Sequence, residues 1–289
     1  MSEPPVDQDG SRAIEPGRAA FARTSGSCGV AIVLVRVSRL FSSAGVTLAV
    51  AFVLSAAAAA QPADPPLDVL MRATDDAMRG DSSESRITMR IKTERWQREL
   101  RLHVVSEGTE TALVRIEAPA KERGTATLKV EQNIWNYLPK VDRTIKVPGS
   151  MMQAAWMGSH FTNDDLVHES RYSEDFECAY RERPADSAGH WLVRCIPLPD
   201  APVVWGAIDA RFRAQDMLLD QAEYFDERDR LVRTIRYEDF GPLGGRTLPR
   251  RMRVIPADDP DEFTEIVYEE HAFNVDLAPG TFSLRSLRQ

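Results

Sequence analysis

The chain has 289 residues, of which 44 are acidic and 36 are basic, so its formal net charge at pH 7 is −8. A protein that holds nucleic acid by its phosphates is expected to carry a basic stripe, and the acidic balance argues against that class. The same balance gives no support for docking on an anionic membrane surface, and it mainly favours solubility.

The first sixty residues have the pattern of a secretion signal. Arg36 and Arg39 precede an apolar run over residues 46–60, which ends in small residues at Ala58–Ala60. A basic region, a short apolar region and an Ala-x-Ala site are typical of a secretory signal peptide, and we expect cleavage near Ala60. The run is shorter than the ~20 residues that span a bilayer, although an uncleaved anchor is an alternative.

Residues 1–29 lie upstream of this signal, where a signal peptide would not place them. We expect that they are a misassigned extension and that Val35 opens the natural signal peptide. Cys28 has Ser25, not Leu, three residues before it, which argues against a lipoprotein attachment site. The remaining residues, 61–289, carry 40 acids and 31 bases and are expected to form one domain.

After a short Pro-rich linker, apolar residues from Leu67 to Met78 approximate helical spacing, and Gly80 can end that helix. Beyond it the apolar period drops to two, which predicts strands with one buried face. Eleven strands are expected, near 87–91, 100–104, 112–116, 126–130, 171–182, 190–197, 203–213, 217–226, 231–239, 247–256 and 263–272. The sequence therefore predicts a mainly β (α+β) fold with a strongly curved antiparallel sheet or barrel.

Two cysteines fall in this second group of strands. Cys178 and Cys195 are equidistant from the centre of the expected turn at 184–189, so a hairpin sets them opposite each other. Cross-strand Cβ atoms lie about 4.5–5.5 Å apart, which local adjustment can close to a disulfide. We expect a disulfide in an oxidising compartment, with two buried thiols as the alternative.

Catalytic motifs are missing from the sequence. It contains no Gly-rich phosphate loop, no His-Glu-x-x-His, no Cys-x-x-Cys and no Gly-x-Ser-x-Gly, so we expect no enzyme and no cofactor. His160, Asp164 and His168 could form a metal site, but polar residues on the surface of a capped helix are favoured. The acidic cluster over 258–262 could bind calcium, but it lacks the pattern of a calcium loop and a solvated turn is favoured.

One short helix is marked in the middle of the chain. Thr162 can cap it with Asp165 three residues on, and Phe161 can pack against Leu166 as a hydrophobic staple. Acidic residues at its start, including Asp164, also suit the positive end of the helix dipole. We interpret these acids as structural.

Residues 133–166 combine two Trp, a Tyr, a Phe and three Met with Gly, Pro and Ser. Large apolar side chains where regular structure is interrupted suit the lip of a cavity better than the middle of a core. Methionine in particular repacks easily around an irregular ligand.

The pattern in this stretch resembles the central signature of the LolA-like outer-membrane lipoprotein-sorting proteins. It consists of Trp135-x-Tyr137-Leu138-Pro139, then Arg143, then Met157-Gly158-Ser159-x-Phe161 and Asp165-Leu166, with Phe282 and Leu287 near the C-terminus. The resemblance covers roughly residues 67–289. It implies a periplasmic protein with an incomplete β-barrel, helices over its mouth and an apolar cavity for acyl chains.

The resemblance also assigns roles to residues. We expect a mobile lid and, beneath it, a barrel wall, with ordinary core packing of the same residues as the alternative. The lid residues are Met151, Met152, Trp156, Met157 and Phe161, and the wall residues are Trp135, Tyr137 and Leu138. In carriers of this fold a buried arginine helps to keep the lid closed, and Arg143 is the candidate here.

Three functions remain open. The first is a monomeric carrier that binds acyl chains of lipoproteins or other lipids and moves them toward the outer membrane. The second is an accessory protein that docks to an inner-membrane lipid exporter through the Met- and Trp-rich edge. The third is an enzyme acting on lipid or peptide, in which His160 and His168 would be the residues to test.

Overall fold

A computed structural model describes residues 64–167, 171–181 and 189–288 of the chain. The expected signal and extension over 1–60 lie outside the described residues, as does His168. Within the described part, no helix combines the length and the apolar character needed to cross a membrane.

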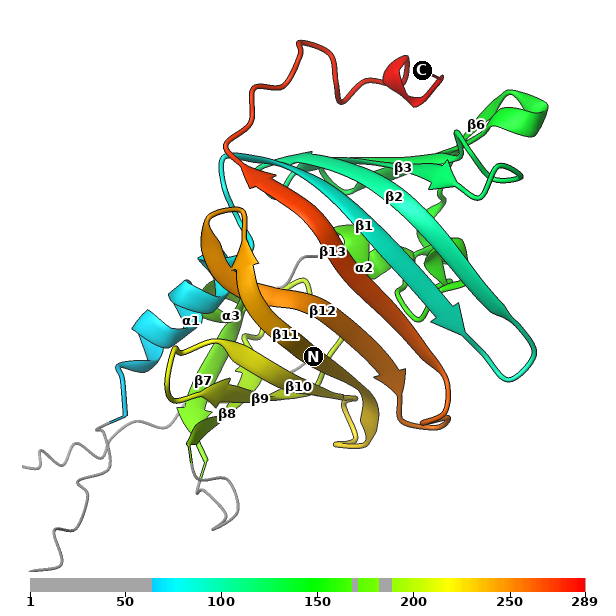
Figure 1. The fold of residues 1–289 in the computed structure, drawn as a ribbon. Helices are drawn as coiled ribbons and strands as arrows, with labels where there is room; N and C mark the ends of the chain where they lie inside the picture. The colour runs from blue at the N-terminus through cyan, green and yellow to red at the C-terminus, as the bar shows by residue number, and fades with distance from the viewer. Residues whose placement is uncertain (1–63, 168–170, 182–188, 289) are drawn as a thin grey trace, which may run out of the picture. The chain divides into compact units, whose positions relative to one another are not determined.

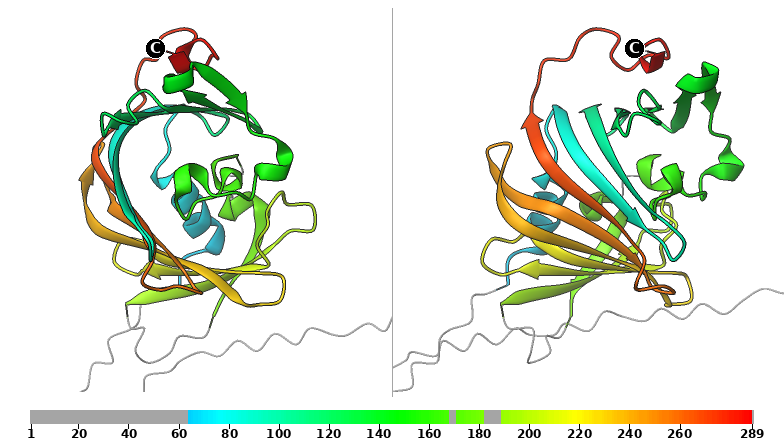
Figure 2. Two further views of the ribbon diagram at one scale, coloured as in Figure 1. Left: turned by 90° about the vertical axis from the view of Figure 1, so that its right-hand side faces the viewer. Right: turned by 45° about the vertical axis from the view of Figure 1, so that its right-hand side comes forward.

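Thirteen antiparallel strands form one sheet in the order β6-β5-β4-β3-β2-β1-β13-β12-β11-β10-β9-β8-β7. Strands that are consecutive in sequence pair with each other, except β6 and β7, and β1 also pairs with β13. Strands β6 and β7 are the two edges, so the sheet stays open. The sheet curls around an interior that contains α2 and the turns before it (Figure 1; Figure 2, left). The predicted mainly β, incomplete barrel is thereby confirmed.

The strands run as follows: β1 (Ser82–Lys92), β2 (Gln97–Glu107), β3 (Thr111–Ala118), β4 (Ala126–Val130), β5 (Asn133–Leu138), β6 (Arg143–Lys146), β7 (Phe176–Tyr180), β8 (His190–Pro197), β9 (Ala207–Arg213), β10 (Leu219–Phe225), β11 (Leu231–Leu243), β12 (Arg246–Pro256) and β13 (Phe263–Phe273). Eleven of them match the predicted strands. The two additional strands, β5 and β6, lie in the Trp- and Pro-rich stretch that the sequence suggested was interrupted.

The helices are short, namely α1 (Leu67–Ala77), α2 (Asn163–Val167), α3 (Tyr172–Asp175) and the 3-10 turns η1 (Pro139–Val141), η2 (Gly149–Met151), η3 (Trp156–Gly158) and η5 (Ser286–Arg288). The predicted helix from Leu67 is confirmed. The strand predicted from residue 171 begins only at Phe176, because Asp75 on α1 accepts hydrogen bonds from the amides of Tyr172 and Ser173 and so supports a turn of helix there.

The expected disulfide is present. Cys178 on β7 lies directly opposite Cys195 on β8, with a Cα–Cα distance of 4.0 Å and an S–S distance of 2.05 Å. The symmetric placement of the two cysteines about the turn therefore predicted the register of this hairpin correctly. The bond ties edge strand β7 to the rest of the sheet.

The two faces of the sheet differ in chemistry. The concave face is apolar, and α1 and α3 pack on its β7–β10 half through a cluster that includes Leu70, Met71 and Phe212. The convex face carries ion pairs between neighbouring strands. Glu265, for example, lies directly across from Arg90 on β1 and from Arg253 on β12, with oxygen to nitrogen distances of 3.1 and 2.5 Å. Cross-strand pairing of this kind accounts for much of the arginine in the chain.

Candidate functional site

The other half of the concave face, formed by β1–β3 and β13, carries a second apolar cluster. Its strand residues are Ile87, Met89, Ile91, Leu100, Leu102, Val114, Ile116 and Ile266. We call residues 149–167, which contain η2, η3 and α2, the inner segment. This segment lies against the cluster inside the curved sheet (Figure 2, left). The inner segment therefore covers the apolar floor of the interior.

Trp156 is the central contact of the inner segment. Its side chain is 5% exposed and belongs to the concave cluster, while Met157 and Phe161 pack at the margin. The indole Nε1 donates a hydrogen bond of 3.1 Å to Oγ1 of Thr127 on β4. A buried indole that has an apolar contact and a satisfied N–H holds a segment firmly and in one orientation.

The backbone at the next two residues is left-handed. Met157 has φ 51° and Gly158 has φ +73°, and the carbonyl oxygen of Met157 accepts a hydrogen bond of 2.7 Å from Nη1 of Arg98. A side chain at a positive φ is strained, and glycine relieves that strain at the second position. This turn is the structural reason for the Met-Gly-Ser motif.

His160 fastens the inner segment to β13. Its Nδ1 lies 2.9 Å from Oγ1 of Thr264, and its Nε2 lies 3.2 Å from a carboxylate oxygen of Glu262. The prediction that His160 is a surface residue is wrong, since its side chain is 15% exposed and forms a link between elements. Among the described residues, no group of three or more His, Cys, Asp and Glu side chains could hold a metal ion.

The capping box predicted at α2 is confirmed. The Thr162 amide donates to Oδ2 of Asp165 at 2.8 Å, and the Asp165 amide donates to Oγ1 of Thr162 at 3.1 Å. The same carboxylate accepts two hydrogen bonds of 2.8 Å from the guanidinium of Arg233 on β11. Thus Asp165 caps its own helix and joins that helix to the sheet.

The Arg233–Asp165 pair is largely withdrawn from water, with side-chain exposures of 9% and 16%. Burial opposes ionisation of Asp165, but the two bonds from Arg233 and the cap from Thr162 outweigh it and lower the pKa of the carboxyl. The guanidinium carbon also lies 4.4 Å from the ring centroid of Trp205 and 4.7 Å from that of Tyr224. These stacked rings hold the arginine in place.

Sequence reasoning missed Arg233, although a signal existed. Ile235 and Tyr237 alternate with outward-facing residues along β11, and Arg233 is in phase with them on the concave face. An arginine at a buried position of a strand requires a partner, and Asp165 supplies it. The partner could not be identified from sequence because 68 residues separate the two.

Trp135 and Tyr137 do not face the inner segment, so their predicted place beneath the lid is wrong. Thr127 bonds both Trp156 and Asn136, so Thr127 and Asn136 lie on the concave face. Because neighbouring residues of a strand point to opposite faces, Trp135 and Tyr137 lie on the convex face. There Tyr137 is buried with Leu287, and Trp135 packs at the edge of that cluster.

The C-terminal part of the motif explains this burial. Leu287 is fully buried against β3–β5, and Phe282 packs beside it. Arg115 donates to the carbonyl oxygens of Ser286 and Leu287 at 2.6 and 3.2 Å. The C-terminal residues therefore cover the convex face of these strands and do not line the interior.

The remaining predicted residues lie at the edge of the sheet. Leu138 and Met151 are exposed, and Met152 is half-buried. Arg143, the candidate latch, is exposed on edge strand β6. The buried arginine that contacts the inner segment is Arg233.

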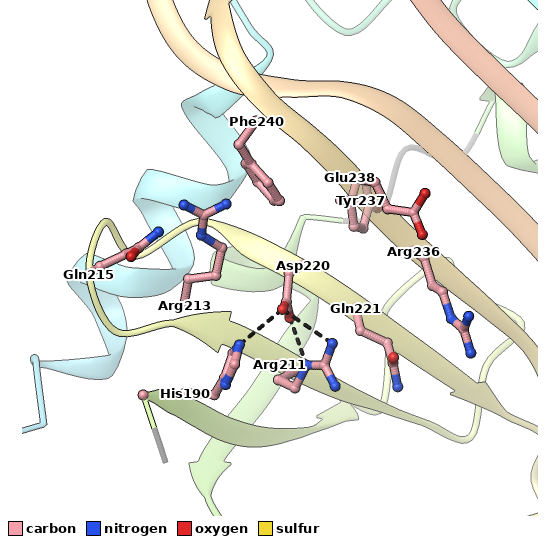
Figure 3. A pocket seen from close by; sticks show the side chains of 11 residues that line it. His190, Arg211, Arg213, Gln215, Asp220, Gln221, Arg236, Tyr237, Glu238 and Phe240 are labelled. Atoms are coloured by element: carbon pink, nitrogen blue, oxygen red, sulfur yellow. Dashed lines mark hydrogen bonds and ion pairs between the residues drawn. The ribbon is translucent and has the colours of Figure 1, made fainter. Parts of the chain in front are cut away.

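A separate hollow of about 730 Å³ lies by the convex face of β8–β11 (Figure 3). The carboxylate of Asp220 stands at its centre and accepts hydrogen bonds of 2.8 and 3.2 Å from Arg211, with Nε2 of His190 at 3.1 Å. This polar and charged lining does not suit an acyl chain.

Comparisons with solved structures define the class of fold. A DUF1329 family protein from Desulfovibrio piger matches with a TM-score of 0.67 at 20% identity, over 76% of this chain and 97% of that one. A putative outer membrane lipoprotein-sorting protein domain from Vibrio parahaemolyticus matches with a TM-score of 0.64 at 16% identity, over 77% and 98%. A LolA superfamily protein from Nitrosomonas europaea matches with a TM-score of 0.62 at 21% identity, over 77% and 100%.

The expected resemblance is confirmed, since the chain has the LolA-like fold. A family model described as "Uncharacterized protein" matches residues 108–289, and the chain belongs to that family. The comparison with curated proteins found no match.

Proposed function

We propose that the protein is a periplasmic carrier that binds acyl chains of lipoproteins or other lipids against the concave face and moves them toward the outer membrane. The observation that carries this proposal is the apolar floor of an open, curved sheet covered by the chain's own inner segment. A carrier needs such a removable cover, because its site must be shielded from water when empty.

An acyl chain and the inner segment would compete for the same floor, and both gain free energy by burying apolar surface there. Transfer of an acyl chain from water contributes ~0.8 kcal/mol per CH₂, or roughly 13 kcal/mol for sixteen methylenes. The inner segment buries the side chains of Trp156 and Val167 and parts of Met157, Phe161 and Leu166, at roughly 1.5–3 kcal/mol for each fully buried side chain. An entering chain can therefore displace the segment and take its place on the floor.

Polar contacts decide when displacement occurs. The inner segment is held by Arg98 on β2, Thr127 on β4, Arg233 on β11 and Thr264 on β13, and by Glu262. We infer that the Arg233–Asp165 pair is the latch, since it joins two opposite charges and Arg233 is the most buried charged group among these contacts. Cargo release then corresponds to return of the segment and of this pair.

The proposal is tested by native mass spectrometry of protein from its own periplasm and by uptake of a fluorescent fatty acid by delipidated protein. Acyl chains that copurify, and saturable uptake near one chain per protein, are expected. Uptake should also change the fluorescence of Trp156. That change is lost in Trp156→Phe and kept in Trp191→Phe, whose indole lies in the other concave cluster. Clean protein that takes up no fatty acid would refute the proposal.

A second function, docking to an inner-membrane lipid exporter without handling lipid, is favoured by one observation. Met151 is 51% exposed at the start of the inner segment. In that case Met151→Asp abolishes recovery of the exporter in a pull-down, while the lipid content of the protein is unchanged. Neither function requires a catalytic residue.

A further inference from the structure

The edge of the sheet at β6 presents an unusual set of exposed apolar side chains. We call residues 138–151, which contain η1, β6 and η2, the edge tip. Val141 is 60% exposed, Ile145 48% and Leu138 39%, and Met151 ends the tip. Figure 1 shows β6 at the outer end of the sheet. A soluble protein rarely gathers such side chains on one protruding feature without a partner for them.

The apolar residues of the tip continue the floor of the interior. In the β5–β6 register, Ile145 lies opposite Asn136, and Leu138 lies opposite Arg143. Asn136 belongs to the concave face through its bond to Thr127. Leu138 and Ile145 therefore share the concave face and form its outermost rim.

The same tip is basic, in a chain whose net charge is −8. Lys140, Arg143 and Lys146 are exposed there, against one acid, Asp142, which accepts a hydrogen bond of 3.1 Å from the Tyr137 hydroxyl. Within residues 64–167, 171–181 and 189–288, neither Lys140 nor Arg143 is engaged in an ion pair.

An adjoining loop adds further basic residues. Lys121 and Arg123 are exposed, and a Cβ placed on Gly124 would lie 3.7 Å from Pro139 at the base of the tip. The acid of this loop, Glu122, is paired with Arg98 and lies 3.8 Å from the Nζ of Lys121, whose side chain remains exposed. Charge and apolar surface are thus concentrated on one corner of the molecule.

We propose that the edge tip docks on the surface of an anionic lipid bilayer. Exposed Val, Ile, Leu and Met side chains can enter the boundary between headgroups and acyl chains, while Lys and Arg contact the lipid phosphates. The overall negative charge keeps the rest of the protein off the same surface, so it orients the tip. This role deepens the proposed carrier function, because the apolar rim would lead an acyl chain from the bilayer to the concave face.

The test is cosedimentation of the full mature chain with vesicles of phosphatidylglycerol and phosphatidylcholine at 1:3, and with vesicles of phosphatidylcholine alone. Binding is expected for the anionic vesicles and should decrease at 0.5 M salt, where charges are screened. Each base near an anionic surface contributes about 1 kcal/mol, which is about fivefold in binding. Lys140→Glu with Arg143→Glu should therefore weaken binding by at least about 25-fold.

Matched variants test whether binding depends on the edge tip itself or only on the total charge and apolar surface of the protein. Arg228→Glu with Arg250→Glu makes the same charge change at exposed sites elsewhere and should leave binding within about twofold. Val141→Ser with Ile145→Ser should abolish binding that survives at high salt, whereas Val69→Ser with Leu231→Ser should not. Circular dichroism and thermal melting verify that each variant is folded.

Several results would overturn the proposal. The first is equal binding to neutral and anionic vesicles, and the second is an equal loss of binding in the tip and control variants. The third is that the tip binds a membrane protein but does not bind vesicles. Dimerisation through β6 that is removed by the tip variants would also overturn it. Uptake of fatty acid from solution is measured without vesicles, so failure of docking and failure of the carrier function are distinguishable.

Discussion

Removal of the charge of Asp165 is the most direct perturbation of the proposed latch. In Asp165→Asn the helix cap can persist, because an amide oxygen can still accept from the Thr162 amide. The two charge-assisted bonds to Arg233 are lost as such, and the guanidinium, 9% exposed, has no counterion. Breaking a buried pair from one side costs about 3–5 kcal/mol.

This cost lowers the free energy of opening of the inner segment. The pair joins α2 to β11, so opening of the inner segment exposes Arg233 to water and relieves the penalty. A loss of 3–5 kcal/mol in the opening free energy corresponds to roughly 10²–10⁴-fold more of the open form. Hydrogen exchange at the Trp156 amide, which donates to the Phe161 carbonyl at 2.8 Å, should accelerate accordingly.

The assay compares this amide with amides of β1 and β2, which lie outside the inner segment. Selective acceleration in residues 155–167, together with faster uptake of fatty acid, is expected. The matched control is the double variant Arg233→Met with Asp165→Leu, which replaces the pair by apolar side chains and should restore slow exchange. Equal acceleration in β1 and β2, or slow exchange in Asp165→Asn, would refute the latch.

Three further predictions follow from the same structure. The pKa of Asp165 is lowered in the folded protein. The contribution of its carboxylate to the stability of the closed inner segment is therefore complete above the ordinary pKa of 3.8, and it is lost as pH falls through the lower folded value. Exchange in the inner segment, corrected for intrinsic rates, should therefore be constant from pH 7 to 5 and rise only below 3.8, and a rise near pH 6 would contradict this. Replacement of both cysteines by serine opens a loop of 17 residues and should cost about 3 kcal/mol, or about 6–12 °C in melting temperature by calorimetry. Leu287→Ala should cost about 2–5 kcal/mol in urea unfolding, because Leu287 is fully buried against β3–β5, and an unchanged midpoint would show that the C-terminal residues do not stabilise the sheet.

Local patterns in the sequence were sufficient for much of the fold. The alternation of apolar residues predicted eleven of the thirteen strands, and the helix from Leu67 was read from its spacing. The cysteine positions predicted the β7–β8 register, and Thr162 with Asp165 predicted the cap of α2. Each of these features depends on residues close together in the chain, so the physics that produces them is local.

Part of the candidate site lies on the concave face. Trp156, Met157 and Phe161 pack against the concave cluster, a placement that fits both the expected lid and the alternative of ordinary core packing. Trp135 and Tyr137 lie on the other face, because the β4–β5 register, and not their proximity in sequence, decides which face they occupy. The C-terminal cover of that face comes from residues about 150 positions away, which no local pattern could indicate.

Local sequence patterns were enough to predict the class of fold, the cap and the disulfide, and they singled out residues 133–166 as the candidate site. The contact of Arg233 with Asp165 and the basic, apolar corner at β6 become apparent in the folded chain. Strand periodicity and turn chemistry act over a few residues, whereas the partner of a buried charge and the face of a strand depend on how a thirteen-stranded sheet curls.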